Sequence, residues 1–281
     1  MSGAELPDGA AVLREWSSAA GAWRKWRREF ALQSRAATDV LLETARVEPG
    51  MRILDLASGS GEPAISLALA AGPKGCVVAT DIVPAMLLGA REHAADRGGG
   101  NVVFAGASGE ALPFADGAFD QLTCRFGVMF FRAVEQAMGE ARRVLKPRGR
   151  AIFLAWGEAR YNTFFSATTG VLLKHAPPAQ QTPDLAHRFA QPGSLSAALG
   201  PAFQQVTETI YSIAWPWPGT PQGFWDYSVE VRRSFRRIFE SLSPDERQQA
   251  KLESLAEMQR FYDGRRVNFV GQIVIASGVR E

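Results

Sequence analysis

Short apolar runs alternate with longer amphipathic stretches through the middle of this 281-residue chain. The apolar runs predict buried β-strands at 52–56, 76–80, 102–105, 119–125 and 151–155. The stretches between them predict helices at 64–71, 84–97 and 133–145. Strands that alternate with helices favour an α/β fold with a parallel, doubly wound sheet. Ligands bind such sheets at the carboxyl ends of the strands.

The N-terminal part of the chain predicts two further helices, at 11–32 and 35–45. Trp16, Trp23 and Phe30 recur near whole turns of the first helix, so they form an aromatic stripe along it. This stripe either packs the helix on the main domain or also faces a ligand pocket, and the sequence leaves both interpretations open.

The part that follows the fifth predicted strand has a different pattern. An aromatic stretch at 161–175 is helical, and alternating apolar residues predict two strands at 205–215 and 268–277. A pair of helices is predicted between these strands, at 224–242 and 244–262.

Glycines end the first predicted strand and mark a nucleotide-binding turn. Gly59 and Gly61 permit a sharp turn and a close approach of a ligand to the backbone, and the next helix offers free N–H groups at its start. Asp81 follows the second strand about 20 residues later, where an acid that binds ribose belongs. The segment 59–64 also matches the dinucleotide pattern, so a nicotinamide or flavin enzyme is an alternative. Asp55, however, would oppose a pyrophosphate with its own negative charge.

Further motifs follow the second strand in a fixed order. They are Gly-Glu-Ala-Leu-Pro-Phe at 109–114, Asp-Gly-Ala-Phe-Asp at 116–120, Leu-Thr-Cys-Arg-Phe at 122–126, Arg-Val-Leu-Lys-Pro-Arg-Gly at 143–149 and Ala-Ile-Phe-Leu-Ala at 151–155. With these motifs, the chain from about residue 47 to 156 resembles the class I S-adenosylmethionine-dependent methyltransferases. The greatest similarity is to the small-molecule type related to the ubiquinone and menaquinone C-methyltransferases.

This resemblance implies a Rossmann-like, doubly wound sheet of seven strands in the order 3-2-1-4-5-7-6. It also implies a division of the chain into an N-terminal helical cap at 1–46, a cofactor-binding core at 47–157, lid or substrate-binding insertions at 158–204 and 216–263, and antiparallel edge strands at 205–215 and 264–281.

The resemblance further implies which residues bind S-adenosylmethionine, whose product would be S-adenosylhomocysteine. They are Asp55, Ala57, Gly59, Gly61, Asp81, Ile82, Met86, Ser108, Gly109, Glu110, Cys124 and Arg125. Asp81 would hold both ribose hydroxyls, and Ile82 and Met86 would pack on the adenine. The chain departs from the family at Ala57, where a glycine is usual, and at Ser108, where an aspartate is usual.

Candidates for the substrate pocket are aromatic, because a partly dry pocket suits both a sulfonium and an apolar acceptor. They are Trp16, Trp23, Phe130, Trp156 and Tyr161, any of which could instead belong to the core. If an acceptor needs a base, His187 is the first candidate for this catalytic role, ahead of His175, Glu158 and Tyr161. A lone histidine is also commonly structural.

Composition narrows the class of function. The 31 basic residues face 29 acidic ones, so nothing favours nucleic acid as a partner. The three histidines and two cysteines lack metal-ligand spacing, and Cys76 and Cys124 are expected to be buried thiols. No apolar run is long enough to span a membrane and the N-terminus does not resemble a signal peptide, so a cytoplasmic location is expected.

The sequence therefore predicts methyl transfer to an oxygen or carbon of a small, largely apolar or aromatic metabolite, by a monomer or homodimer. The alternatives are a nicotinamide-dependent oxidoreductase and an enzyme that binds S-adenosylmethionine yet catalyses rearrangement or cyclisation without methyl transfer.

Overall fold

The computed structural model describes residues 9–177 and 185–281, and its centre is a sheet of seven strands in the order β3-β2-β1-β4-β5-β7-β6. The strands are β1 Arg52–Leu56, β2 Cys76–Asp81, β3 Val102–Gly106, β4 Phe119–Arg125, β5 Leu145–Trp156, β6 Gln204–Trp217 and β7 Val267–Val279. The first five run parallel, and β7 is antiparallel to both β5 and β6. The predicted fold class and strand order are confirmed.

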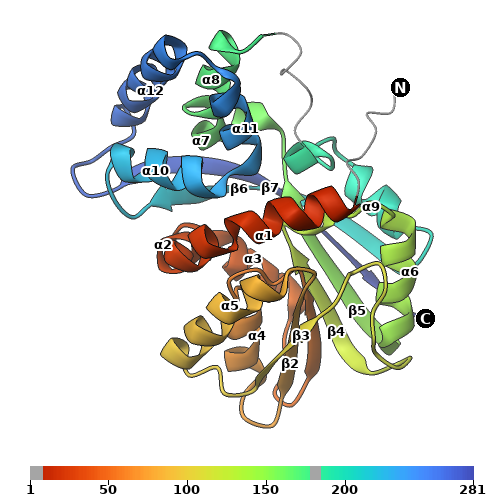
Figure 1. Ribbon diagram of the computed structural model, residues 1–281. Helices are drawn as coiled ribbons and strands as arrows, with labels where there is room; N and C mark the ends of the chain where they lie inside the picture. The colour runs from red at the N-terminus through yellow and green to blue at the C-terminus, as the bar shows by residue number, and fades with distance from the viewer. Residues whose placement is uncertain (1–8, 178–184) are drawn as a thin grey trace.

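Helices cover both faces of the sheet, as a doubly wound topology requires. Figure 1 shows one group of helices to the left of the sheet and another to its right. The first group is α3 Arg35–Ala45, α4 Ala64–Ala71 and α5 Pro84–Arg97, and the second is α6 Val134–Val144 and α9 Ser194–Leu199. Because both faces are covered, Ile53, Leu54 and Leu122 of the central strands are fully buried.

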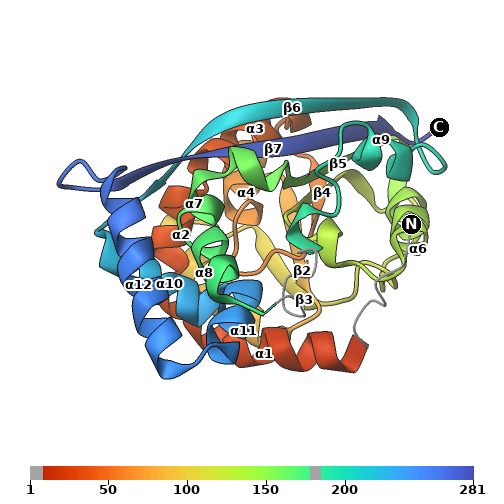
Figure 2. The same ribbon diagram turned by 90° about the horizontal axis from the view of Figure 1, so that it is seen from above.

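A further layer lies over the carboxyl ends of the parallel strands (Figures 1 and 2). It comprises α1 Gly9–Lys25, α2 Arg27–Gln33, α7 Thr163–Ser166, α8 Thr169–His175, α10 Pro221–Val231, α11 Arg233–Ser241 and α12 Pro244–Gln259. The described residues also form the 3₁₀ turns η1 Val128–Phe130, η2 Ala159–Tyr161 and η4 Leu185–His187. In Figure 2, α1 lies along the lower edge of the view, and β6 and β7 run along its upper edge and extend to the left, toward α10 and α12.

Three predicted helices are interrupted in the structure. The helix at 11–32 ends at Trp26, whose ring packs on Trp217 and whose Nε1 donates to Glu230 at 2.9 Å. The helix at 224–242 breaks at Arg232, which has an extended backbone. The stretch at 161–175 is divided among η2, α7 and α8. The first two breaks occur where a large side chain turns inward to a tertiary partner, which outweighs local helix propensity.

Parts of two predicted segments lie outside the described residues, namely 1–8 of the cap and 178–184 of the lid. None of the helices in the described ranges is both long and apolar enough to cross a membrane.

Candidate active site

A cavity of about 480 Å³ lies at the carboxyl ends of the parallel strands. This volume falls in the range of small-molecule sites. Its lining comes from the loops after β1, β2, β3 and β4 and from the N-terminal helices: Leu13, Trp16, Trp23, Phe30, Ala57, Gly59, Ser60, Glu62, Asp81, Ile82, Met86, Ala107, Ser108, Gly109, Glu110, Arg125, Phe126, Gly127, Phe130, Phe131 and Arg132. Nine of the twelve predicted cofactor-binding residues are among these.

The loop after β1 has an unusual backbone. Ala57 and Gly59 have φ values of 52° and 51°, in the left-handed region. This conformation costs an alanine roughly 1–2 kcal/mol, so the departure from glycine at residue 57 is a strained one. Gly61 has φ 106°, and a Cβ there would lie 2.8 Å from the Ile65 side chain. Gly61 therefore lets the loop pack closely and does not itself line the cavity.

Asp81 ends β2 at the cavity with a fixed carboxylate. One oxygen accepts the N–H of Gly59 at 3.0 Å and the other accepts the N–H of Val83 at 2.9 Å. Burial raises the pKa of this carboxyl group, and the two backbone donors oppose that rise. Each carboxylate oxygen has a further lone pair, so the group can still accept hydrogen bonds from a ligand diol.

The other residues predicted at the adenine end surround this carboxylate. Ile82 leaves 49% of its surface exposed where it lines the cavity, whereas Met86 is buried among Val83 and Trp23. A Cβ at Gly109 would lie 2.8 Å from the Phe131 ring, so only glycine lets that ring pack here.

Ser108 and Glu110 shape the loop after β3. The Ser108 hydroxyl accepts the N–H of Glu110 at 3.2 Å. The Glu110 carboxylate accepts the backbone N–H of Arg132 at 2.6 Å and that of Ala133 at 3.2 Å, immediately before α6. Both residues line the cavity, and the carboxylate of Glu110 also has this structural role.

Two predicted cofactor-binding side chains lie beneath the cavity and do not line it. Asp55 is fully buried and accepts the Thr123 hydroxyl at 2.6 Å, and its Oδ2 has no partner among the described residues. Burial raises the pKa of Asp55 to about 6. Cys124 is fully buried too, and burial raises the pKa of its thiol. The other cysteine, Cys76, is half-buried, and both thiols are free.

Arg125, one of the predicted cofactor-binding residues, is almost fully buried at the site. Its side chain lines the cavity at the end of β4, yet only 6% of the residue is exposed. Its guanidinium donates to the hydroxyls of Ser34 and Thr38, both at 2.8 Å, and to the carbonyl of Glu62 at 2.9 Å. Burial lowers the pKa of this guanidinium, and nearby acids offset part of the effect.

Aromatic rings form the other wall of the cavity. Trp16, Trp23 and Phe130 line it as predicted, with the rings of Trp16 and Phe130 edge to face at 5.3 Å. Trp156 is instead buried behind the wall, where it stacks on Phe126 at 4.2 Å. Tyr161 is 48% exposed and does not line the cavity.

Phe30, Phe126 and Phe131 line the wall as well, and of these Phe30 was missed as a wall residue by the sequence reasoning. Phe30 belongs to the aromatic stripe of the N-terminal helix, Phe126 directly follows the fourth strand, and Phe131 lies at the end of the 3₁₀ turn after it. A position in the aromatic stripe of a helix, or shortly after the end of a strand, was the sequence signal that could identify them as wall residues.

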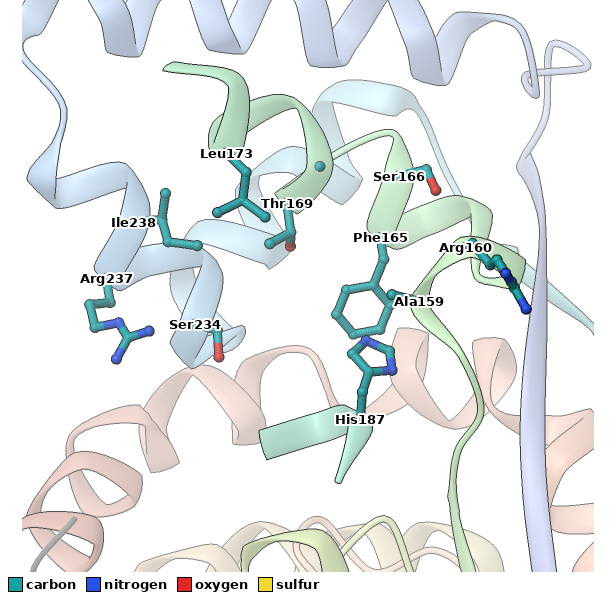
Figure 3. A pocket seen from close by; sticks show the side chains of 11 residues that line it. Ala159, Arg160, Phe165, Ser166, Thr169, Leu173, His187, Ser234, Arg237 and Ile238 are labelled. Atoms are coloured by element: carbon teal, nitrogen blue, oxygen red, sulfur yellow. The ribbon is translucent and has the colours of Figure 1, made fainter. Parts of the chain in front are cut away.

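His187, the predicted catalytic base, lies in a second cavity of about 320 Å³ (Figure 3). Its Nδ1 lies 2.7 Å from the Gly157 carbonyl and its ring meets Phe165 edge to face at 4.5 Å. Figure 3 shows the two rings together between α8, α11 and η4. His187 thus lies outside the first cavity, because η4 holds the ring against the end of β5, and its role as a base stays a prediction.

The other two histidines do not line the first cavity either. His175 pairs with Glu253 at 3.0 Å, and His93 is buried against the Ser60 carbonyl. Within 9–177 and 185–281, no cluster of three histidine, cysteine or acidic side chains could hold a metal ion.

Comparisons with known proteins start with curated relatives. The chain is 42% identical over 113 residues to a ubiquinone/menaquinone biosynthesis C-methyltransferase UbiE of Methylobacterium nodulans, covering 40% of this chain and 44% of that protein. It is 41% identical over 118 residues to the UbiE of Ectopseudomonas mendocina, covering 42% and 46%. The chain thus spans about half the length of the curated relatives it matches.

Solved structures share the fold over more of the chain. A putative methyltransferase from an antibiotic biosynthesis pathway of Anabaena variabilis has a TM-score of 0.60 at 17% identity, covering 85% of this chain and 95% of that one. The 4+2 cyclase SpnF has a TM-score of 0.59 at 17% identity, with 99% of each chain covered. At such identities the likeness shows the fold alone.

A family model decides the relationship. The model of the ubiE/COQ5 methyltransferase family matches residues 23–173, more than half of the chain. This match contains the glycine loop, Asp81 and all the motifs on which the resemblance rested. S-adenosylmethionine is the cofactor of this family, and this agrees with the cofactor predicted from the sequence. The chain belongs to the ubiE/COQ5 methyltransferase family.

Proposed function

We propose that this protein transfers a methyl group from S-adenosylmethionine to an oxygen or carbon atom of a small, largely apolar or aromatic metabolite. The observation that carries the proposal is the single cavity that joins Asp81 and the glycine loop to the wall of Trp16, Trp23 and Phe130. The part of the cavity at Asp81 and the glycine loop suits an adenosyl group, and the part at the aromatic wall suits an apolar acceptor. A nicotinamide-dependent oxidoreductase is not favoured, because the glycine loop lies within the family match.

The residues of the cavity fit the cofactor. The Asp81 carboxylate is held by two backbone donors and can accept both hydroxyls of a ribose. The exposed face of Ile82 would be covered by an adenine ring. Ala57 and Gly59 bring the backbone of the loop close to the amino acid end.

The residues of the cavity align the acceptor with the cofactor, exclude water and provide a favourable electrostatic surface. The bound cofactor supplies an electrophilic methyl group on a sulfonium. The aromatic wall stabilises that positive charge through the ring faces and keeps water away. Alignment of the acceptor with the methyl group can supply most of the acceleration. No histidine lines this cavity, so we propose no side chain as the base.

We also propose that the insertions at 158–204 and 216–263 form a lid that selects the substrate. The N-terminal helices meet α10 and α11 through polar contacts across the top of the molecule. Glu230 accepts from Lys25 at 2.7 Å and from Trp26 at 2.9 Å, and Arg233 pairs with Glu15. The cytoplasmic location and the monomeric or dimeric state stay predictions.

Formation of S-adenosylhomocysteine tests the proposal. The purified protein is incubated with S-adenosylmethionine and a panel of acceptors, and both products are followed by mass spectrometry. Because the matched relatives are named for ubiquinone and menaquinone biosynthesis, the panel includes hydroxylated quinols and simple phenols of increasing apolar size. Equal amounts of methylated acceptor and S-adenosylhomocysteine support the proposal. Conversion of the acceptor without formation of S-adenosylhomocysteine would contradict the proposal and support rearrangement or cyclisation instead.

A further inference from the structure

The positive charge of Arg125 has no anionic partner among the described residues. Its guanidinium is bonded to neutral groups, the hydroxyls of Ser34 and Thr38 and the carbonyls of Ser34 and Glu62. No carboxylate within 9–177 and 185–281 forms an ion pair with it, and its Nε–H has no acceptor there. A buried guanidinium without an anion is costly, so an anionic ligand would stabilise this arrangement.

The two nearest acids are committed elsewhere. The Glu62 carboxylate accepts the Ser66 hydroxyl at 2.7 Å and lies 4.0 Å from Arg97. The Asp55 carboxylate accepts the hydroxyl of Thr123. Their negative charges act on Arg125 only from a distance, and neither carboxylate forms a hydrogen bond or ion pair with it among the described residues.

The position of Arg125 indicates which anion it binds. It ends β4, which pairs with β1 directly before the glycine loop, and it contacts Glu62 within that loop. Asp81, the expected ribose ligand, belongs to β2 on the other side of β1. A cofactor with its ribose at Asp81 would direct its amino acid end toward Arg125, and this end carries the cofactor's only carboxylate. Phe30 and Phe126 flank the guanidinium at 5.5 and 5.8 Å, and such apolar surroundings strengthen an ion pair.

We propose that the Arg125 guanidinium binds the carboxylate of the cofactor's amino acid end. The inference rests on the proposed function and gives Arg125 the role of a cofactor-anchoring residue. Through Ser34 and Thr38, the same guanidinium is bonded to the start of α3. Cofactor binding at Arg125 therefore also fixes the N-terminal helices over the cavity.

Two ligands that differ only at the amino acid end test this role by calorimetric titration. S-adenosylhomocysteine contains the carboxylate, whereas 5′-methylthioadenosine has the adenosine and sulfur without the amino acid end. In Arg125→Met we expect the affinity for S-adenosylhomocysteine to fall roughly 10- to 100-fold, as for loss of a hydrogen-bonded ion pair. The affinity for 5′-methylthioadenosine should change less than about threefold. If Arg125→Met does not fold, Arg125→Gln takes its place in the titration, because glutamine keeps a hydrogen-bond donor for Ser34.

Arg150→Met is the matched control. Arg150 is also a partly buried arginine whose Nε has no partner among the described residues, and it donates to the Ser277 hydroxyl. It lies in β5 far along the sheet from the cavity, so this variant should bind both ligands as the wild type does.

The outcomes separate this inference from the proposed function. If the wild type binds S-adenosylhomocysteine and an Arg125 variant binds it equally well, Arg125 does not hold the carboxylate. Equal losses for both ligands would also overturn the inference, because they would indicate general damage to the cavity. If the wild type binds neither ligand, the proposed function fails and the inference with it.

Discussion

At the scale of single residues, Asp55 makes the stability of the protein depend on pH. Its pKa is raised from 3.8 to about 6 by burial, so the folded protein binds the proton more tightly than the unfolded chain. The resulting stabilisation is present in full below pH 4 and is lost as the pH rises through 6. The loss is on the order of 2–3 kcal/mol.

Urea unfolding of the wild type and Asp55→Asn at pH 4.5 and 7.5 measures this effect. The asparagine can still accept the Thr123 hydroxyl, and it does not titrate. We expect the variant to gain stability relative to the wild type between the two pH values. A difference between the two proteins that does not change with pH would show that Asp55 titrates normally.

Gly127 and Ala57 are predicted to be coupled by direct contact. A Cβ at Gly127 would lie 2.5 Å from the Ala57 Cβ and 2.9 Å from the Cys124 sulfur. Gly127→Ala should therefore destabilise the protein by about 1–3 kcal/mol, measured by urea unfolding. Ala57→Gly removes one of the two clashes, so the double variant should be more stable than the sum of the two single effects by at least about 0.5 kcal/mol.

Gly139→Ala provides the control for this pair. Gly139 lies in α6 with open space around it, so alanine there should stabilise the protein by about 0.5–1 kcal/mol. Strictly additive effects of Gly127→Ala and Ala57→Gly would contradict the contact.

Single residues differ in how far the sequence predicted their role. Asp81, Gly59 and Ile82 line the cavity as expected, because their places follow from strand ends and the family motifs. The burial of Asp55 and the unpaired charge of Arg125 depend on side chains from distant segments, such as Thr123 and Ser34. No local pattern in the sequence records such contacts.

At the scale of elements, α12 depends on its first turn. Ser243 and Glu246 form a capping box, in which the serine hydroxyl accepts the Glu246 N–H and the glutamate accepts the Ser243 N–H at 2.8 Å. Ser243→Ala should destabilise α12 by about 1 kcal/mol. Hydrogen exchange should become faster at the start of this helix.

Gln248→Ala tests whether the effect belongs to the cap. Gln248 is an exposed residue within the same helix, so its replacement should leave hydrogen exchange nearly unchanged. Equal protection in Ser243→Ala and the wild type would mean that α12 is held by packing alone.

Helix and strand bounds were predictable where local signals coincide with packing. The helices at 35–45 and 84–97 and the strand at 119–125 begin and end where the pattern predicts. The breaks at Trp26 and Arg232 were not predictable, because each results from a partner far along the chain. The Glu230 carboxylate accepts a hydrogen bond from the Trp26 ring, and the Thr168 hydroxyl accepts one from Arg232.

At the scale of the whole molecule, the cavity brings together the glycine loop and the aromatic wall from α1, and the sequence predicted the position of the first better than that of the second. The strand order and the place of the glycine loop followed from the family resemblance, and both agree with the structure. The wall from α1 was one of two open interpretations of an aromatic stripe. The position of His187 in a separate cavity depends on how η4 meets β5, which only the folded structure shows.

The central claim is that this cavity binds S-adenosylmethionine through Asp81. Calorimetric titration with S-adenosylhomocysteine, on the wild type, Asp81→Asn and the control Asp96→Asn, tests it most directly. Asp96 is an acid on α5 that pairs with Arg28 and does not line the cavity. We expect wild-type and Asp96→Asn protein to bind alike, and Asp81→Asn to bind about tenfold or more weakly. Equal binding by all three proteins would contradict the role of Asp81, and wild-type protein that binds a nicotinamide nucleotide instead would contradict the proposed function.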